Sequence, residues 1–129
     1  MQPKQPTIPI VIITSTPTPL TPVGMPNRSV GGGDLGIPPL GQYGVMGGVG
    51  LNNVGLLVTT WGRVTATGSG YAIIDDGSGT PVRIDTSTLV DPPEDNDYIT
   101  VIGISSLYEM ATDHHRLVLP RGSGDVSTW

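Results

Sequence analysis

Residues 56–67 read Leu-Leu-Val-Thr-Thr-Trp-Gly-Arg-Val-Thr-Ala-Thr, a long run of residues that favour extended backbone. Side chains of Val, Thr and Trp fit a pleated, half-buried surface, so this run predicts a strand. Gly62 lies inside it, and a glycine within a strand often marks a bulge or a bend. The next glycines, Gly68 and Gly70, flank a serine and predict a turn at the end of the strand.

Four further strands are predicted downstream of that turn, over residues 71–75, 81–85, 98–105 and 116–119. Asp76-Gly-Ser-Gly79 is typical of a hairpin turn, residues 91–97 of a polar loop, and Pro120 ends the last strand. No window of 11 residues has the apolar period of an amphipathic helix. Short strands separated by turn signals favour an all-β sandwich or barrel.

The order of these segments resembles a known fold. Leu57-Val58, Gly62-Arg-Val64, Ile74-Asp-Asp-Gly-Ser-Gly79, Val82-Arg-Ile84 and Asp97-Tyr-Ile-Thr-Val-Ile-Gly103 resemble an OB-fold barrel. More narrowly, residues 45–125 are similar to OB-like modules of bacterial secreted and surface proteins. The resemblance implies a five-stranded OB-type barrel over residues 56–129.

The resemblance also implies a ligand-binding face. OB folds commonly bind oligonucleotides or oligosaccharides on the face of their second and third strands. In this sequence that face would offer Tyr71 and Arg83, together with Trp61. Proteins that bind single-stranded nucleic acid use stacking aromatics and a basic groove, and this sequence offers one or two aromatics and two nearby arginines there.

The charge of the chain bears on which class is favoured. The net charge is −5, and residues 56–129 alone carry four arginines and ten acidic residues. Binding of nucleic acids depends largely on cations that release counterions from phosphates. The acidic balance therefore argues against nucleic acid and against an anionic membrane surface as partners, and it favours an oligosaccharide as the ligand.

The first 55 residues differ from the rest in composition. They hold nine of the 13 prolines, 11 of the 19 glycines and only three charged side chains. We predict three parts: an N-terminal strand and Thr/Pro spacer (1–22), a Gly-rich ordered coil packed on the barrel (23–55), and the barrel (56–129). Apolar side chains within the coil distinguish it from a solvated linker.

The N-terminal arm is the feature that most suggests assembly. Residues 7–15 are β-branched without alternation, which predicts an extra strand buried on both faces. Such a strand could add to its own barrel or complete the sheet of a neighbouring copy, as in donor-strand assembly. A head-to-tail contact that does not close produces a filament. The predicted assembly residues are Ile8, Ile10, Val11, Ile12, Ile13 and Thr14.

Two segments near the arm carry modification signals. The Thr-Pro steps at Thr16, Thr18 and Thr21 resemble O-glycosylated stalks and favour an extended spacer. Asn27-Arg-Ser29 is a sequon for N-glycosylation. The apolar run at residues 8–13 is too short to span a bilayer and lacks the features of a signal peptide.

Metal binding and catalysis find little support in the sequence. His114 and His115 are adjacent, and such residues on a strand point to opposite faces, so we expect an exposed loop there rather than a metal site. Turn chemistry accounts for Asp75 and Asp76, and residues 91–97 are expected to be a solvated acidic loop rather than a cation site. No serine has the context of a catalytic nucleophile. We therefore expect no enzyme activity, no cofactor and no metal.

These observations favour a non-enzymatic, extracellular or cell-surface structural protein that assembles with copies of itself through residues 8–14. The alternative is an OB-type module that binds an oligosaccharide through Trp61, Tyr71 and Arg83. Such a module could also be an accessory domain of a larger secreted protein.

Overall fold

The computed structural model describes residues 21–38 and 40–129, and within them all regular structure longer than one helical turn is β. The predicted strand at residues 7–15 lies outside the described residues. The elements are β1 (Val23–Gly24), the 3-10 turn η2 (Asn27–Ser29), β2 (Leu57–Gly68), β3 (Tyr71–Asp75), β4 (Val82–Asp85), β5 (Tyr98–Met110), β6 (Asp113–Leu119), η3 (Ser123–Asp125) and β7 (Val126–Thr128).

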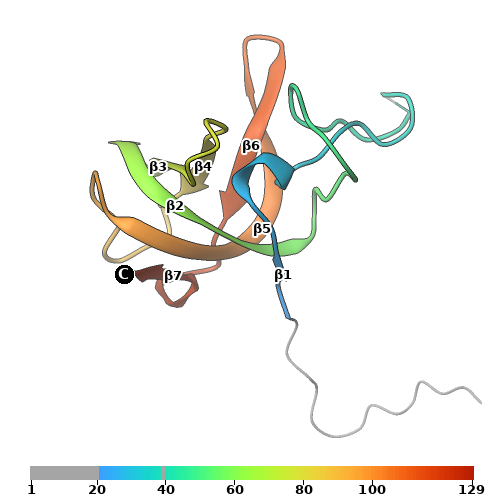
Figure 1. The fold of residues 1–129 in the computed structure, drawn as a ribbon. Helices are drawn as coiled ribbons and strands as arrows, with labels where there is room; N and C mark the ends of the chain where they lie inside the picture. The colour runs from blue at the N-terminus through green and yellow to red at the C-terminus, as the bar shows by residue number, and fades with distance from the viewer. Residues whose placement is uncertain (1–20, 39) are drawn as a thin grey trace, which may run out of the picture.

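Five of these strands close into a ring (Figure 1). The order is β2, β3, β4, β6 and β5, and β5 returns to pair with β2. The β4–β6 pair is parallel, whereas the other four pairs of the ring are antiparallel. Outside the ring, β1 pairs in parallel with β2, and β7 pairs with β5. The prediction of an all-β fold is confirmed.

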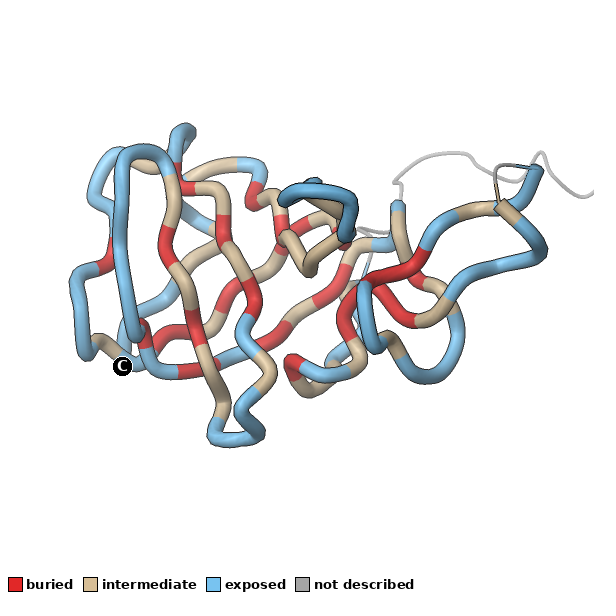
Figure 2. Tube along the Cα trace, turned by 90° about the horizontal axis from the view of Figure 1, so that it is seen from above, coloured by how far each residue is buried: buried red, intermediate tan, exposed pale blue. Residues whose placement is uncertain are grey.

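The core lies inside the ring, and buried residues alternate with more exposed ones along strands such as β3 and β4 (Figure 2). Successive side chains of a strand point to opposite faces, so every second residue is buried. The buried side chains are almost all β-branched and small, which suits a narrow interior. They are Val58, Val64, Ala72, Ile74, Val82, Ile84, Ile99, Val101 and Val118, with Val30 from the preceding coil.

Gly62 lies where the long strand β2 exchanges one neighbour for another. β2 pairs with β5 up to Arg63 and with β3 from Arg63 onward, and Gly62 precedes that residue. A Cβ on Gly62 would lie 2.8 Å from the carbonyl carbon of Asp75. Gly62 therefore allows a close backbone approach, while the irregularity in register lies between Val64 and Ala66. The predicted bulge is thus displaced from the glycine.

The coil before β2 is joined to the ring by a buried asparagine. Asn53 Oδ1 accepts hydrogen bonds from the backbone N–H of Gly31 and from Ser105 Oγ, both at 2.7 Å. Its Nδ2 donates to the carbonyl oxygen of Ser29 at 2.7 Å. Since Val30 is fully buried in the same core as the strands, residues 27–33 and 53 are part of the folded unit.

The observed strands differ from the predicted ones mainly at their ends. β5 continues to Met110 and β6 begins at Asp113, so these strands form a tight hairpin through Ala111, whose φ is 61°. β1 and β7 were not predicted, because two or three residues carry no readable period. Among the described residues, no helix has the length and apolar character needed to cross a bilayer.

Candidate functional site

Arg83 lies between two tyrosine rings on the outer surface of the ring of strands. It points outward from β4 because its neighbours Val82 and Ile84 are buried. Its guanidinium carbon lies 4.0 Å from the centroid of the Tyr71 ring on β3 and 4.8 Å from that of Tyr108 on β5. Contacts between arginine and aromatic faces are attractive and hold the guanidinium plane in place.

The edge of that guanidinium remains open for a ligand. Within the part of the chain that the structure describes, no protein acceptor takes an N–H group of Arg83. A guanidinium carries five N–H donors in a fixed fork, which matches the two oxygens of a carboxylate or a sulfate. Arg83 is therefore a preorganised donor for an oxyanion.

A second arginine lies next to this group, on β6. Arg116 lines the same 360 Å³ hollow as Arg83, together with Tyr108 and His115. Its Nη2 donates to the carbonyl oxygen of Arg28 at 3.1 Å, whereas its Nε is buried and has no partner among the described residues. Burial lowers the pKa of Arg116 from its ordinary value. A buried donor without a partner costs roughly 1–3 kcal/mol.

Arg28 extends the positive surface. It lines an adjoining hollow of about 530 Å³ that shares Met46, Thr80 and Arg116 with the first one. Three of the chain's five arginines thus gather on one side of the molecule. We call this surface the arginine face and define it by Arg28, Tyr71, Arg83, Tyr108, His115 and Arg116.

Acidic groups bound the arginine face at the end where Arg83 lies. Asp85 and Glu109 line the next hollow along the sheet, beyond Arg83. The ion pairs between described residues are Arg121 with Asp125 and His114 with Glu109, so neither neutralises an arginine of this face. The local charge is therefore positive in a chain whose net charge is −5.

Both histidines lie within β6, which corrects the prediction of an exposed loop. They project to opposite sides of the strand, and each contacts a different aromatic ring. His114 stacks on Tyr43 with ring centroids 4.5 Å apart, and its Nε2 lies 3.5 Å from Glu109 Oε2. His115 lies 5.4 Å from the Tyr108 ring. The sequence did not reveal that the histidines belong to a strand, because Ala111-Thr112 is a poor turn signal.

The three residues of the predicted ligand face do not share one surface. Tyr71 and Arg83 lie together on the arginine face, whereas Trp61 lines a separate hollow with Tyr98 and Trp129. All three side chains point outward, but β2 pairs with β5 at Trp61 and curves away from β4. The prediction missed Tyr108 and Arg116. Arg116 begins the predicted strand at residues 116–119, and Tyr108 follows the predicted strand at residues 98–105.

The sequon residue Asn27 is a structural residue in this fold, which corrects its prediction as a glycosylation site. Its side chain is fully buried. Nδ2 donates to Thr60 Oγ1 at 2.8 Å and to the carbonyl oxygen of Trp61 at 3.0 Å, and Oδ1 accepts the backbone N–H of Asp76 at 2.8 Å. A glycan on Nδ2 would remove these contacts and could not fit inside the fold.

The paired carboxylates at the end of β3 organise a turn. Asp75 Oδ1 accepts the backbone N–H groups of Gly77 and Gly79, and Asp76 Oδ1 accepts that of Ser78. Burial by itself raises the pKa of Asp76, but the hydrogen bonds from Asn27 and Ser78 bring it below its ordinary value. Among the described residues, no group of three or more histidine, aspartate or glutamate side chains is arranged to hold a metal ion.

The remaining predicted site residues lie in the arm. Ile8, Ile10, Val11, Ile12, Ile13, Thr14, Thr16 and Thr18 are outside the described residues, and Thr21 is exposed.

Comparison with known proteins identifies no family for this chain. No family model matches the sequence, and no curated protein is significantly similar to it.

Proposed function

We propose that this chain is a non-catalytic binding module of the OB type and that its ligand is an acidic oligosaccharide held on the arginine face. The observation that carries the proposal is the position of Arg28, Arg83 and Arg116, three guanidinium groups that form no ion pair with a carboxylate among the described residues of an otherwise acidic molecule. Uronate carboxylates or sulfate esters are the ligand groups that such donors recognise.

The strand arrangement supports the OB-type assignment. The proposal is supported by the ring of five strands with β3 and β4 side by side, an arrangement that an OB-type barrel requires. OB folds bind oligosaccharides on the surface of their second and third strands, which here are β3 and β4. Tyr71 and Arg83 lie on that surface.

The chemistry of the face favours a sugar acid over a bare anion. The edges of Arg83 and Arg116 would donate to the acidic group, while Tyr71 and Tyr108 flank it with apolar ring surface. Because the acidic wall of Asp85 and Glu109 lies beyond Arg83, a long uniformly charged polymer would be repelled at that end.

The similarity to modules of bacterial secreted and surface proteins leads us to propose an extracellular or cell-surface location. In that setting the module would be an accessory part of a larger protein or assembly and would attach it to a polysaccharide.

Isothermal titration calorimetry tests this proposal with polygalacturonate hexamers, sulfated hexasaccharides, neutral maltohexaose and a single-stranded dT oligonucleotide. We expect at least one acidic sugar to bind, and to bind more weakly at high salt. The affinity for that sugar should fall tenfold or more in Arg83→Met and in Arg116→Met. Arg121→Met is the matched control, since Arg121 is exposed and paired with Asp125 outside the face. Tighter binding of dT than of every acidic sugar would overturn the proposal.

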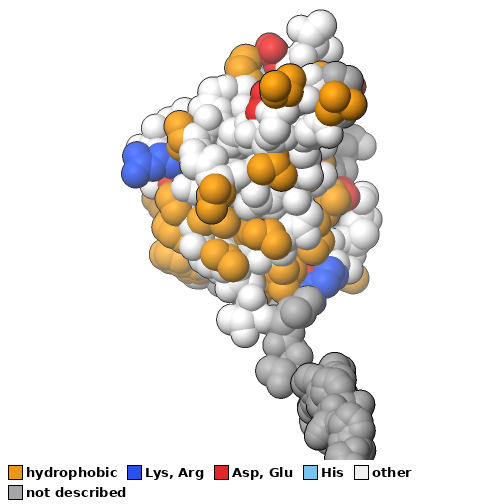
Figure 3. Space-filling model, turned by 90° about the vertical axis from the view of Figure 1, so that its right-hand side faces the viewer, with side chains coloured by type: hydrophobic (Ala, Val, Ile, Leu, Met, Phe, Trp, Pro, Cys, Tyr) orange, Lys and Arg blue, Asp and Glu red, His pale blue; other side chains and the backbone are white. Residues whose placement is uncertain are grey.

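A second candidate function, self-assembly into a filament or surface layer, is favoured by an exposed apolar surface. Among the described residues, nine of the 14 exposed large hydrophobic side chains fall within residues 23–56. Leu40, Leu51 and Ile37 are 97%, 88% and 81% exposed. Figure 3 shows hydrophobic side chains gathered on the side of the molecule that these loops form. Patches of this kind commonly mark protein interfaces.

The proposed assembly joins this surface to the arm. Residues 8–14 would leave one copy and complete the sheet of the next, with a glycosylated Thr/Pro spacer between the two copies. Light scattering of the full chain, of a chain starting at Pro22 and of the Leu40→Asp, Leu51→Asp double variant tests it. Polymers of the full chain that dissociate in both variants support assembly, whereas a strictly monomeric full chain contradicts it.

A further inference from the structure

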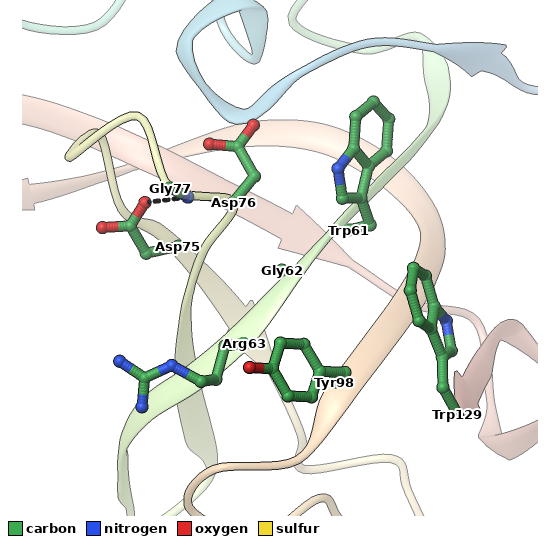
Figure 4. Close-up of a pocket in the computed structure, with 8 residues that line it drawn as sticks. All are labelled: Trp61, Gly62, Arg63, Asp75, Asp76, Gly77, Tyr98 and Trp129. Carbon is green, nitrogen blue, oxygen red and sulfur yellow. Dashed lines mark hydrogen bonds between the residues drawn. The ribbon is translucent and has the colours of Figure 1, made fainter.

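A hollow away from the arginine face is lined by both tryptophans of the chain. It has a volume of about 360 Å³ and lies where β2, β5 and β7 meet the turn after β3 (Figure 4). We call it the aromatic cleft and define it by Trp61, Arg63, Asp75, Asp76, Tyr98 and Trp129. It is separate from the arginine face, with which it shares no lining residue.

One wall of the cleft is aromatic and held by the sheet. The rings of Tyr98 and Trp129 are stacked with centroids 6.5 Å apart. Trp129 Nε1 donates to Thr100 Oγ1 at 2.9 Å, and the backbone N–H of Trp129 donates to the carbonyl oxygen of Tyr98 at 2.9 Å. Trp61, Tyr98 and Trp129 are nevertheless 39%, 55% and 77% exposed. Fixed aromatic rings with exposed surface are ready to cover an apolar face of a ligand.

The other wall consists of charged groups, as Figure 4 shows on the side away from the indoles. Asp75 uses Oδ1 for the N–H groups of Gly77 and Gly79, and within the described residues nothing donates to its Oδ2. Both oxygens of Asp76 accept backbone N–H groups. Arg63 donates one N–H to Asn96 Oδ1 at 2.8 Å. This wall thus offers an unused carboxylate acceptor beside an arginine donor.

We infer that the aromatic cleft binds a neutral pyranose ring of an oligosaccharide. A pyranose has C–H groups on its faces, which can lie against Trp61 or Trp129, and hydroxyl groups around its edge that both donate and accept. Its hydroxyls would donate to Asp75 Oδ2 and accept from Arg63. A sugar acid is disfavoured because two carboxylates line the cleft. The inference does not depend on the function proposed for the arginine face.

A proline-rich peptide is the competing occupant, since aromatic grooves also bind such segments. Residues 16–22 of this chain have that composition. Proline itself lacks an N–H group, so such a segment offers donors only at its non-proline residues, whereas a pyranose carries hydroxyl donors around its whole edge. A polyhydroxylated ligand therefore matches the charged wall better than a proline-rich segment.

Tryptophan fluorescence of the full chain tests the inference directly, because both tryptophans line the cleft. The probes are neutral cello-, xylo-, manno-, malto- and chitohexaose, with polygalacturonate hexamer and a synthetic peptide of residues 14–24 for comparison. We expect a saturable change with at least one neutral sugar. That sugar should bind tenfold or more weakly to Trp61→Ala and Asp75→Asn.

These two variants separate binding from folding. Asn at position 75 keeps the carbonyl oxygen that accepts from Gly77 and Gly79 but replaces the free acceptor with a donor. Tyr43→Ala removes an exposed aromatic ring outside the cleft and should leave sugar binding unchanged. The inference is overturned if no neutral sugar gives a saturable change, if Asp75→Asn binds that sugar normally, or if the acidic sugar or the peptide binds most tightly with an affinity that Trp61→Ala weakens and Arg83→Met does not. Binding of acidic sugars at the arginine face is measured by separate variants, so either idea can fail alone.

Discussion

Asn27 and Asp76 bind each other reciprocally through backbone and side chain. The backbone N–H of Asn27 donates to Asp76 Oδ2 at 2.9 Å, and the backbone N–H of Asp76 donates to Asn27 Oδ1 at 2.8 Å. The pair joins η2, which precedes the ring of strands, to the turn that connects β3 with β4. It also borders the aromatic cleft, so the stability of this contact and the shape of the cleft are linked.

Replacing Asn27 with Ala should destabilise the protein strongly. The change removes three side-chain hydrogen bonds and leaves the buried hydroxyl of Thr60 without its partner. We expect a loss of about 2–4 kcal/mol in the free energy of unfolding, measured by chemical denaturation. Ser29→Ala is the control, because it removes the same sequon while keeping these bonds. Equal stability of the two variants would contradict a structural role for Asn27.

The protein should lose stability in acid, in part through Asp76. Its pKa is lower in the folded state than its ordinary value of 3.8, because its hydrogen bonds outweigh the effect of burial. The resulting stabilisation is complete above the unfolded-state pKa and is lost as the pH falls below about 4, through the folded-state value. Asp76→Asn should be less stable at pH 7 and show a shallower decline below pH 4. The control Asp91→Asn, in an exposed loop, should show the same dependence of stability on pH as the wild-type protein. If Asp76→Asn matched the wild-type protein at every pH, this account would be refuted.

Gly103 should not tolerate a side chain. It lies next to Ile104, where β5 leaves β2 and joins β6, and a Cβ there would lie 2.6 Å from the carbonyl oxygen of Leu119. Gly103→Ala should lower the free energy of unfolding by roughly 2–4 kcal/mol or prevent folding, since the strands must move apart. Gly124→Ala, with no atom within 4 Å of the added Cβ, should change stability little. Comparable melting temperatures for the two variants would argue against this packing constraint.

A chain restricted to residues 56–129 should be much less stable than one covering residues 21–129. The shorter chain lacks Val30 from the core and leaves Ser105 Oγ without Asn53. The single substitution Val30→Ala should lower the free energy of unfolding by about 1–3 kcal/mol. The same substitution at the exposed Val49 should leave the free energy of unfolding almost unchanged. Circular dichroism during urea denaturation gives the unfolding midpoints of the two chain lengths and of the two single variants. Identical midpoints for the two chain lengths would show that the coil is dispensable.

The central strands could be predicted because their patterns are strong and local. β3 matches its predicted range of residues 71–75, and β4 differs by one residue, since alternation and glycine turns mark both. The strands β5 and β6 were predicted too short, as residues 98–105 and 116–119 with a loop between them, because neither Ala111 nor Thr112 is a typical turn residue. Ala111 nevertheless adopts a positive φ of 61° there.

The candidate sites depend on information that strand patterns do not contain. Arg83 and Tyr71 were predicted together because they lie on adjacent strands. Tyr108 and Arg116 join them only because β4 pairs in parallel with β6, a contact between segments far apart in the sequence. Trp61 was grouped with the wrong partners, since an outward direction does not reveal which side of a closed ring a residue occupies. A period-two reading of β5 could have marked Tyr98 and Tyr108 as outward aromatics.

The closure of the ring also has a consequence for the kinetics of folding. The β2–β3–β4 meander and the β5–β6 hairpin form from neighbouring residues, whereas the pairs β2–β5 and β4–β6 join the two units across the loop at residues 86–97. Contacts distant in sequence must overcome loop entropy before they stabilise the chain, and proteins dominated by them fold in milliseconds to seconds. The docking of these two units is therefore expected to limit the rate of refolding.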